Sequence, residues 1–269
     1  MQGTSLPSSS AAAASPSEPR PLVILTGASR GMGLAMARQL LQQGHALVTL
    51  ARATSGELAG IAQQAGAPLE QWEQDLADGA AAAGRLRQWL TARPAGSYAS
   101  ATLINNAGVV PRIAPLSDCE PADLANALRV GLEAPMQLTA AFLAATRGWG
   151  VPLKVLNISS GLGRRAMASQ SAYCAAKAGM DHFTRCLALD EAQRPGGARV
   201  CSLAPGVIDT DMQVHLRAAD PAAFPDQQNF ANLKTDGALT SPDDAAARVL
   251  AWLARPDFGD TPVADVRQP

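Results

Sequence analysis

The chain has 269 residues, of which 47% are hydrophobic and 17% are charged, and this composition excludes a disordered or fibrous protein. Such a length fits one large or two small globular domains. The 22 basic and 23 acidic residues leave a net charge of −1, so we expect no binding to nucleic acid or anionic lipid. Polar residues interrupt every apolar run before the ~20 residues that a membrane span needs, which predicts a soluble protein without membrane contact.

The first twenty residues, MQGTSLPSSSAAAASPSEPR, are mostly Ser, Ala and Pro. They have neither the basic start nor the apolar core of a secretory signal, so we expect residues 1–20 to form a disordered tail before a domain over 21–269. The four cysteines show no C-x-x-C pair and no histidine at metal-ligand spacing: Cys119, Cys174, Cys186 and Cys201. We therefore expect no metal site, no disulfide framework and a cytoplasmic location.

Short β-rich runs alternate with longer helical patterns from Leu22 onward. Strands are expected at 22–26, 46–50, 69–74, 102–106, 154–159, 199–204 and 262–266. Helices are expected near 32–43, 57–65, 79–92, 121–147, 171–193 and 242–254. This alternation is typical of parallel strands joined by crossover helices. It predicts an α/β fold with one doubly wound, seven-stranded parallel sheet flanked by helices.

The expected helix at 121–147 has two unusual features. Pro135 lies inside it and should kink or locally open the helix, because proline lacks a backbone donor and crowds the preceding turn. The helix also carries more apolar surface than one stripe facing the sheet requires, which suggests a contact between subunits. A homodimer or homotetramer is therefore expected.

The segment between Pro205 and Ser241 is too long for a simple connection between a strand and a helix. Long excursions in compact domains are usually functional lids or binding loops. This one follows the carboxyl end of an expected strand, where open α/β sheets bind their ligands. We expect a lid over about 207–240.

A glycine-rich turn, TGASRGMG at 26–33, follows the first expected strand and opens the first expected helix. Glycines at such a turn let backbone N–H groups approach a pyrophosphate at the helix N-terminus. The spacing here is G-x-x-x-G-x-G, which differs from the usual dinucleotide fingerprint G-x-G-x-x-G. The turn favours a phosphate cradle, and a plain tight turn is the alternative.

The second expected strand ends in Leu50, Ala51 and Arg52, where a unit that binds NAD would place an acidic residue. Arg52 and Arg30 could instead form charge-assisted hydrogen bonds to a 2′-phosphate, which favours NADP(H). The alternative is two solvated arginines, because all but three of the 22 basic residues are arginines.

Tyr173 and Lys177 are four residues apart in an expected helix, so their side chains share one face. The chain has only two tyrosines and three lysines, and this pair follows a strand that ends near Ser159 and Ser160. A positive lysine beside a phenol favours the phenolate, and a shift of the pKa from ~10 towards 7 needs about 4 kcal/mol. We expect Lys177 and a cationic nicotinamide to lower the pKa of Tyr173 in this way.

Six motifs in this order resemble the short-chain dehydrogenases/reductases along essentially the whole chain after the tail. They are TGASRGMG (26–33), Asp75-Leu76, NNAG (105–108), NISS (157–160), YCAAK (173–177) and PGVIDT (205–210). The resemblance implies a single Rossmann-like domain. It also implies that Tyr173 protonates the carbonyl oxygen, Ser160 holds that oxygen, and Lys177 lowers the pKa of the tyrosine and binds the nicotinamide ribose.

The resemblance also implies a set of cofactor residues, with Asp75 at the adenine and the segment 205–210 at the carboxamide. These residues are Gly27, Ser29, Arg30, Gly31, Met32, Gly33, Arg52, Asp75, Leu76, Asn105, Ala107, Gly108, Tyr173, Lys177, Pro205, Gly206, Val207, Ile208 and Thr210.

One residue departs from the family pattern. Members usually have an asparagine in the long helix that sustains a local break and holds a water of the proton relay, whereas this chain has Gly131. Gly131 with nearby Pro135 could preserve the break, since both residues weaken a regular helix. The alternative function is a catalytically weak, NADP(H)-binding regulatory protein.

The segment after PGVIDT is similar to the sepiapterin reductase and bacterial benzil reductase branch, through PGVIDTDMQ, Leu216-Arg217, Asp220-Pro221, Leu233-Lys234, Gly237 and Leu239. This resemblance implies an NADPH-dependent reductase acting on a small ketone or vicinal dicarbonyl, such as benzil or the dicarbonyl side chain of a pterin. Met212 and Asp265 are the expected substrate residues. Asp265 could equally be an aspartate that caps a turn at the end of a strand.

Overall fold

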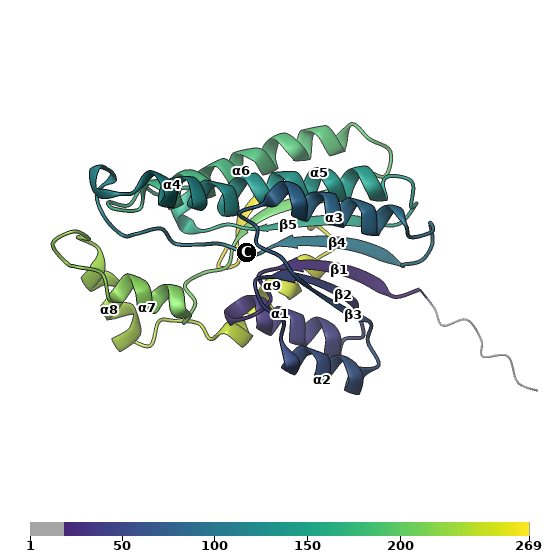
Figure 1. Ribbon diagram of the computed structural model, residues 1–269, viewed down its shortest axis with the longest axis horizontal. Helices are drawn as coiled ribbons and strands as arrows, with labels where there is room; N and C mark the ends of the chain where they lie inside the picture. The colour runs from purple at the N-terminus through teal and green to yellow at the C-terminus, as the bar shows by residue number, and fades with distance from the viewer. Residues whose placement is uncertain (1–18, 269) are drawn as a thin grey trace, which may run out of the picture.

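The computed structural model describes residues 19–268, whose central sheet is shown in Figure 1. The strands are β1 (Pro21–Thr26), β2 (Ala46–Ala51), β3 (Leu69–Glu73), β4 (Ser100–Asn105), β5 (Leu153–Ile158), β6 (Arg199–Ala204) and β7 (Val263–Asp265). They pair in the order β3-β2-β1-β4-β5-β6-β7, and every pair is parallel. The expected seven-stranded parallel sheet is confirmed.

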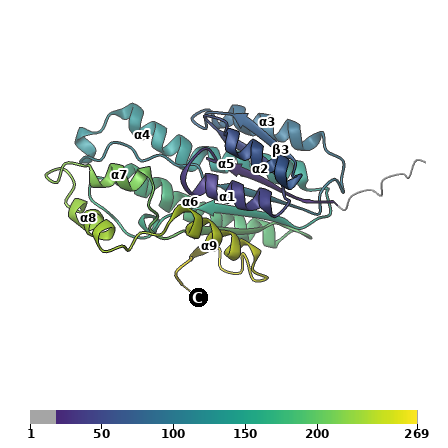
Figure 2. The same cartoon turned by 90° about the horizontal axis from the view of Figure 1, so that it is seen from below.

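Helices cover both faces of the sheet (Figures 1 and 2). One face carries α3 (Gly79–Thr91), α5 (Ala134–Thr146) and α6 (Ser171–Ala192), and the other carries α1 (Gly31–Gln42), α2 (Gly56–Ala65) and α9 (Pro242–Ala254). The central strands are buried on both faces, which explains why β1 and β2 read as continuous apolar runs rather than as alternating patterns.

Several of these helices begin at the residues that the sequence favours. The hydroxyl of Ser55 accepts from the amide of Leu58 at the start of α2, and Asp78 accepts from Ala81 at the start of α3. Ser241 caps α9 in the same way, with Pro242 in the first turn. These caps satisfy amide groups that a helix N-terminus leaves free. By contrast, α1 begins at Gly31 with no side-chain cap.

The single helix expected over 121–147 is divided. α4 (Pro121–Leu128) and α5 are joined by a π-helical turn at Arg129–Glu133. Pro135 has no N–H to donate to the carbonyl of Gly131 four residues earlier, so the regular hydrogen-bond ladder cannot continue through this point. The expected local opening is therefore confirmed, and it is centred on Gly131.

The segment expected to form a lid contains two helices that the sequence did not predict, α7 (Asp211–Arg217) and α8 (Gln227–Thr235). The two ends of the segment are held together by a bridge between Ile208 and Thr240. Phe224 is fully buried in a third apolar cluster with Ile113, Met167 and Leu216. The segment thus packs on a small apolar core that it shares with other loops, and it projects with α4 beyond the end of the sheet (Figure 2).

Residues 1–18 of the expected tail lie outside the described part of the chain. Arg20, which was also assigned to the tail, is attached to the fold instead: its carbonyl accepts from Ala99, and its guanidinium donates to the carbonyl of Gly66 at 2.7 Å. Between residues 19 and 268, no helix is both long enough and apolar enough to cross a membrane.

Candidate active site

A cleft of about 830 Å³ lies at the carboxyl edge of the sheet. Its walls come from the turns after β1, β2, β4, β5 and β6, together with α6 and α7. The strand order reverses between β1 and β4, so the connections after these two strands leave in opposite directions and open a crevice between them. Ligands of open α/β sheets bind at such a point.

The glycine turn after β1 forms one end of this cleft. Gly27 has a φ of 72°, and a Cβ on Gly33 would overlap the carbonyl oxygen of Gly27, so neither position suits a larger residue. The first turn of α1 has neither a capping side chain nor an acidic residue. Its free amide groups and the positive end of the helix dipole therefore suit a phosphate group, and the turn fits the pyrophosphate of a dinucleotide.

Two arginines flank the glycine turn. Arg30 lines the cleft and pairs at 3.1 Å with Asp211 at the start of α7, which links the cradle to the lid segment. Arg52 lines the cleft just after β2, and its side chain makes no hydrogen bond or ion pair within the described range 19–268. The guanidinium of Arg52 is thus available to bind a negatively charged group of a ligand beside β2.

The cleft brings together nearly all the residues that the sequence assigned to a cofactor. Those lining it are Gly27, Ser29, Arg30, Gly31, Met32, Gly33, Arg52, Asp75, Leu76, Ala107, Gly108, Tyr173, Lys177, Pro205, Gly206, Val207, Ile208 and Thr210.

Asn105 is the exception, and its assignment to the cleft is wrong. Its side chain is buried beneath the cleft, where Nδ2 donates to Asn157 Oδ1 at 2.8 Å and to Thr139 Oγ1 at 3.2 Å. The neighbouring Asn106 lines the cleft instead and donates to the carbonyl oxygens of Thr26 and Gly27. Asn105 is the last residue of β4, so its side chain joins strands, whereas Asn106 braces the glycine turn.

Ser160 and Tyr173 both line the cleft. Ser160 follows β5 and caps a short 3₁₀ turn (Gly161–Gly163) by accepting from the amide of Leu162 at 3.2 Å. Tyr173 lies in the first turn of α6, and its hydroxyl is 4.0 Å from Sδ of Met212 in α7. Strand, helix and lid therefore all converge on the phenol.

Burial raises the pKa of Tyr173 above its ordinary value of 10, and a hydrogen bond with Ser160 opposes this shift. The expectation that Lys177 lowers this pKa is not met in the protein alone, because the lysine ammonium bonds to another group and lies 5.8 Å from the centre of the phenol ring. At neutral pH Tyr173 therefore keeps its proton, as a proton donor must.

Lys177 is buried one turn after Tyr173, and its ammonium donates to the carbonyl oxygen of Ile158 at 2.7 Å. Burial lowers the pKa of Lys177 to about 8, and the carboxylate of Asp181 opposes the shift. A lysine with such a pKa can exchange a proton near neutral pH.

Asp181 anchors a buried polar group behind Lys177. Its carboxylate accepts from Ser202 of β6 at 2.6 Å and from Nε of Arg164 at 3.1 Å. Arg164 follows the turn that Ser160 caps, and it also donates to the carbonyl of Ala264 in β7 at 2.8 Å. The group ties α6 to two strands and to the turn that carries Ser160.

The two expected substrate residues have different outcomes. Met212 lines the cleft, but Asp265 does not. The Asp265 carboxylate accepts from the backbone N–H of Arg267 at 3.0 Å and from Nε and Nη2 of its guanidinium, which lowers the pKa of Asp265. The alternative interpretation, an aspartate capping a turn after β7, is the one that the structure supports. Arg267 reaches the cleft instead.

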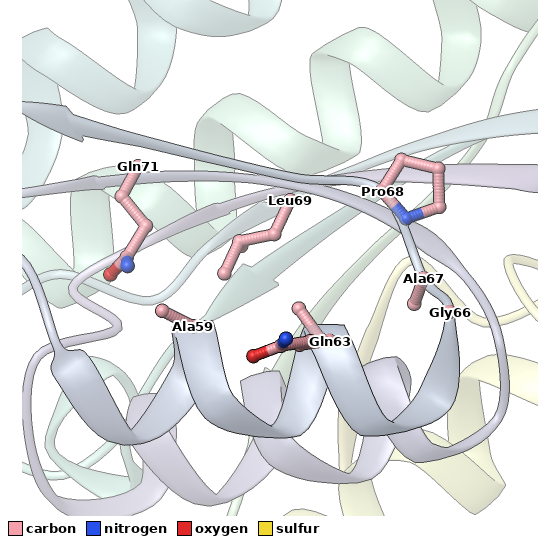
Figure 3. Close-up of a pocket in the computed structure, with 8 residues that line it drawn as sticks. Ala59, Gln63, Gly66, Ala67, Pro68, Leu69 and Gln71 are labelled. Atoms are coloured by element: carbon pink, nitrogen blue, oxygen red, sulfur yellow. The ribbon is translucent and has the colours of Figure 1, made fainter.

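The sequence assigned no individual role to several other residues that line the cleft. They are Asn126, Arg165, Gln170, Gln213, Leu216, Phe230 and Arg267. They come from α4, the turn before α6, the lid segment and the C-terminus, which only the tertiary fold brings together. A separate hollow lies between α2 and β3 (Figure 3). Its lining, which includes Ala59, Gln63, Pro68 and Leu69, contains no titratable side chain.

Known proteins resemble this chain in sequence and in structure. A family model described as short chain dehydrogenase matches residues 21–221. Benzil reductase ((S)-benzoin forming) from Bacillus cereus is 33% identical over 236 residues, which cover 88% of this chain and 95% of the relative. Sepiapterin reductase from Meriones unguiculatus is 34% identical over 252 residues, covering 87% of this chain and 92% of the relative.

Among solved structures, a short-chain dehydrogenase/reductase from Burkholderia vietnamiensis superimposes with a TM-score of 0.62 at 35% identity. The superposition covers 93% of this chain and 98% of the other. The sequence motifs, the parallel sheet and the extent of the family match agree with one another. The chain therefore belongs to the short-chain dehydrogenases/reductases, a family of oxidoreductases that bind NAD(P).

Proposed function

We propose that the protein is an NADPH-dependent carbonyl reductase of small ketones or vicinal dicarbonyls. One observation carries this proposal: Ser160, Tyr173 and Lys177 line the same cleft as the glycine cradle of α1. A proton donor and a binding site suited to a dinucleotide thus share one cavity. The relatives named as benzil reductase and sepiapterin reductase support a dicarbonyl substrate.

The cofactor would lie between the glycine turn and Lys177, with its pyrophosphate on the amides of α1. NADPH bound there supplies a hydride for the carbonyl carbon. Arg52 supports the phosphorylated form, because its guanidinium follows β2 without an acidic partner in the described range 19–268. Lys177 would hold the nicotinamide ribose by hydrogen bonds from its ammonium.

Reduction adds a hydride to the carbonyl carbon and a proton to the carbonyl oxygen. Ser160 holds and polarises that oxygen by donating a hydrogen bond to it. Tyr173, protonated at neutral pH, gives up its phenolic proton as charge develops on the oxygen. Lys177 then stabilises the phenolate and supports its reprotonation, since a pKa of about 8 leaves the ammonium charged at neutral pH.

The substrate end of the cleft suits an aryl or other apolar group. Val110, Met212, Leu216 and Phe230 line it, and they join the apolar cluster that supports the lid segment. A planar aromatic substituent would exclude water from these side chains while its carbonyl faces Ser160 and Tyr173.

A homodimer or homotetramer is part of the same proposal. Leu128 and Met136 remain 41% and 43% exposed on the helices beside the π turn, and Leu189 of α6 is 71% exposed. These large apolar side chains support a subunit contact on the layer of α4, α5 and α6. Size-exclusion chromatography with light scattering tests the contact, and a monomeric mass at micromolar concentration would contradict it.

The test of the activity is consumption of NADPH with benzil, 1-phenyl-1,2-propanedione and sepiapterin, followed by chromatographic identification of the alcohol. We expect turnover with at least one dicarbonyl and a strong preference for NADPH over NADH. If NADPH binds but none of these compounds or a wider panel of ketones is reduced, the proposal is wrong.

A further inference from the structure

Two glutamines that line the cleft each have one buried amide atom without a hydrogen-bond partner in the described residues. Gln170 is 1% exposed and Gln213 is 6% exposed, and both line the cleft that contains Tyr173. Within residues 19–268, neither Nε2 of Gln170 nor Oε1 of Gln213 has a hydrogen-bond partner. Buried amides normally find partners, because an unpaired one loses its hydration without compensation.

The backbone fixes Gln170 at the start of α6, three residues before Tyr173. Gln170 precedes the first residue of α6, and its carbonyl accepts from the amide of Cys174 at 2.8 Å. The residue before it, Ser169, has a φ of 63°, an unfavourable conformation for a residue other than glycine. The hydroxyl of Ser169 donates to the carbonyl of Ala223 in the lid segment, which offsets part of this strain. Strained residues of this kind persist where they position a functional group.

Gln213 comes from the lid segment. It lies in the first turn of α7, where its backbone N–H donates to the carbonyl of Thr210 at 2.8 Å. The preceding residue, Met212, places its sulfur 4.0 Å from the hydroxyl of Tyr173. The side chains of Gln170 and Gln213 therefore come from two elements next to the proposed proton donor. These are the start of α6, which carries Tyr173, and α7, which carries Met212.

Nε2 of Gln170 can donate to a substrate oxygen, and Gln213 can do the same once its side-chain amide is turned so that Nε2 takes the place of Oε1. Ser160 and Tyr173 already account for the oxygen of the carbonyl that is reduced. We propose that Gln170 and Gln213 form a subsite for a second oxygen, adjacent to the reacting carbonyl. This inference rests on the proposed reductase function and narrows its substrate class to vicinal dicarbonyls.

The subsite should favour diketones strongly over simple ketones. A second carbonyl oxygen accepts from the amide N–H groups of the subsite, whereas a simple ketone of the same size leaves these N–H groups facing a methylene group. A site built to hydrogen-bond an oxygen rejects an analogue that lacks it, because the polar groups of the site are then left unpaired.

The experiment compares substrates matched in shape. Benzil is paired with deoxybenzoin, in which a methylene replaces one carbonyl, and 1-phenyl-1,2-propanedione is paired with propiophenone. The variants are Gln170→Met and Gln213→Met, which keep the side-chain length and remove the amide. Gln228→Met, on the exposed face of α8, is the matched control. Because diketones are intrinsically more electrophilic, the readout is the change in the diketone-to-ketone ratio of kcat/KM relative to the unmodified protein.

We expect each cleft variant to lower kcat/KM for the diketones by roughly 10- to 100-fold while the simple ketones lose little, so that the ratio collapses. The affinity for NADPH and the melting temperature should stay unchanged, and Gln228→Met should keep the original ratio. Parallel losses with both kinds of substrate, or an unchanged ratio, would overturn the subsite and leave the reductase function intact. If the unmodified protein reduces neither these four compounds nor sepiapterin and the wider panel of ketones, both proposals fail.

Discussion

The ammonium of Lys177 donates a 2.7 Å hydrogen bond to the carbonyl oxygen of Ile158, the last residue of β5. This contact fixes the lysine at the end of the strand that leads into Ser160, and one turn after Tyr173 in α6. The three proposed catalytic side chains are thus positioned by one strand end and one helix start. Burial in this position lowers the pKa of the lysine to about 8.

The first prediction concerns the pH dependence of reduction. Lys177 loses its proton as the pH rises through about 8, and a neutral amine stabilises the phenolate of Tyr173 less well. We expect kcat/KM for reduction to be level at neutral pH and to fall above about pH 8. Stopped-flow measurement of NADPH oxidation across this range tests it. A profile that stays level to pH 10 would separate the activity from the charge on Lys177.

Asp181 should set the position of that alkaline limb. Its carboxylate raises the pKa of Lys177, so Asp181→Asn should move the limb to lower pH. The substitution also removes the negative charge that pairs with Arg164 and one of the two acceptor oxygens, and it should lower the free energy of unfolding by about 1–3 kcal/mol. Asp190→Asn, on the exposed side of the same helix, is the control. A destabilised variant with an unshifted pH profile would assign Asp181 a purely structural role.

A substitution at Gly131 tests whether the protein is a reductase or the alternative regulatory protein. A Cβ at this position would lie 3.0 Å from Cβ of Ala176, the residue before Lys177, so a side chain there requires a small local displacement of α6 or of the π-helical turn. We expect Gly131→Asn to lower kcat/KM by roughly 10-fold through this displacement. Gly148→Asn, which meets no atom within 4 Å, is the control. An unmodified protein without turnover that Gly131→Asn activates would instead favour the regulatory protein.

Arg52 should determine the preference for the phosphorylated cofactor. Arg52→Gln removes a charge-assisted contact to the 2′-phosphate, and we expect the Kd for NADPH to rise roughly 10-fold or more while the Kd for NADH stays constant. Arg87→Gln, exposed on α3, controls for the change in net charge. Fluorescence titration of both cofactors measures the effect. Equal losses for NADPH and NADH would show that Arg52 does not contact the 2′-phosphate.

Local pattern predicted the sheet because most strands are short apolar runs, of which the central ones are buried on both faces, and each crossover helix has its own periodicity. The glycine turn and the pair Tyr173 and Lys177 were also predictable, since their roles depend on spacing within a single element. Even the opening of the long helix followed from Pro135, whose missing N–H is a local property.

The remaining features depend on tertiary contacts. α7 and α8 are short and acquire their core only by packing Leu216 and Phe224 against other loops. Asn105 and Asn106 are adjacent in sequence. β4 ends at Asn105, so the side chain of Asn105 is buried between strands and that of Asn106 is not, and the exact end of the strand was not predictable. Asp265 was misassigned because its partner, Arg267, is two residues away, and the sequence alone does not show that they pair. Gln213 ends the motif PGVIDTDMQ, but neither its place there nor the position of Gln170 indicates a role for the side-chain amide.

The most direct test of the account is the Tyr173→Phe variant, measured with NADPH and the best dicarbonyl substrate. Phenylalanine keeps the ring and the burial but removes the proton that the reduction requires. We expect kcat/KM to fall by roughly 100-fold or more, while the Kd for NADPH and the melting temperature stay close to those of the unmodified protein. Turnover that persists at the original rate in this variant would contradict the assignment of Tyr173 as the proton donor.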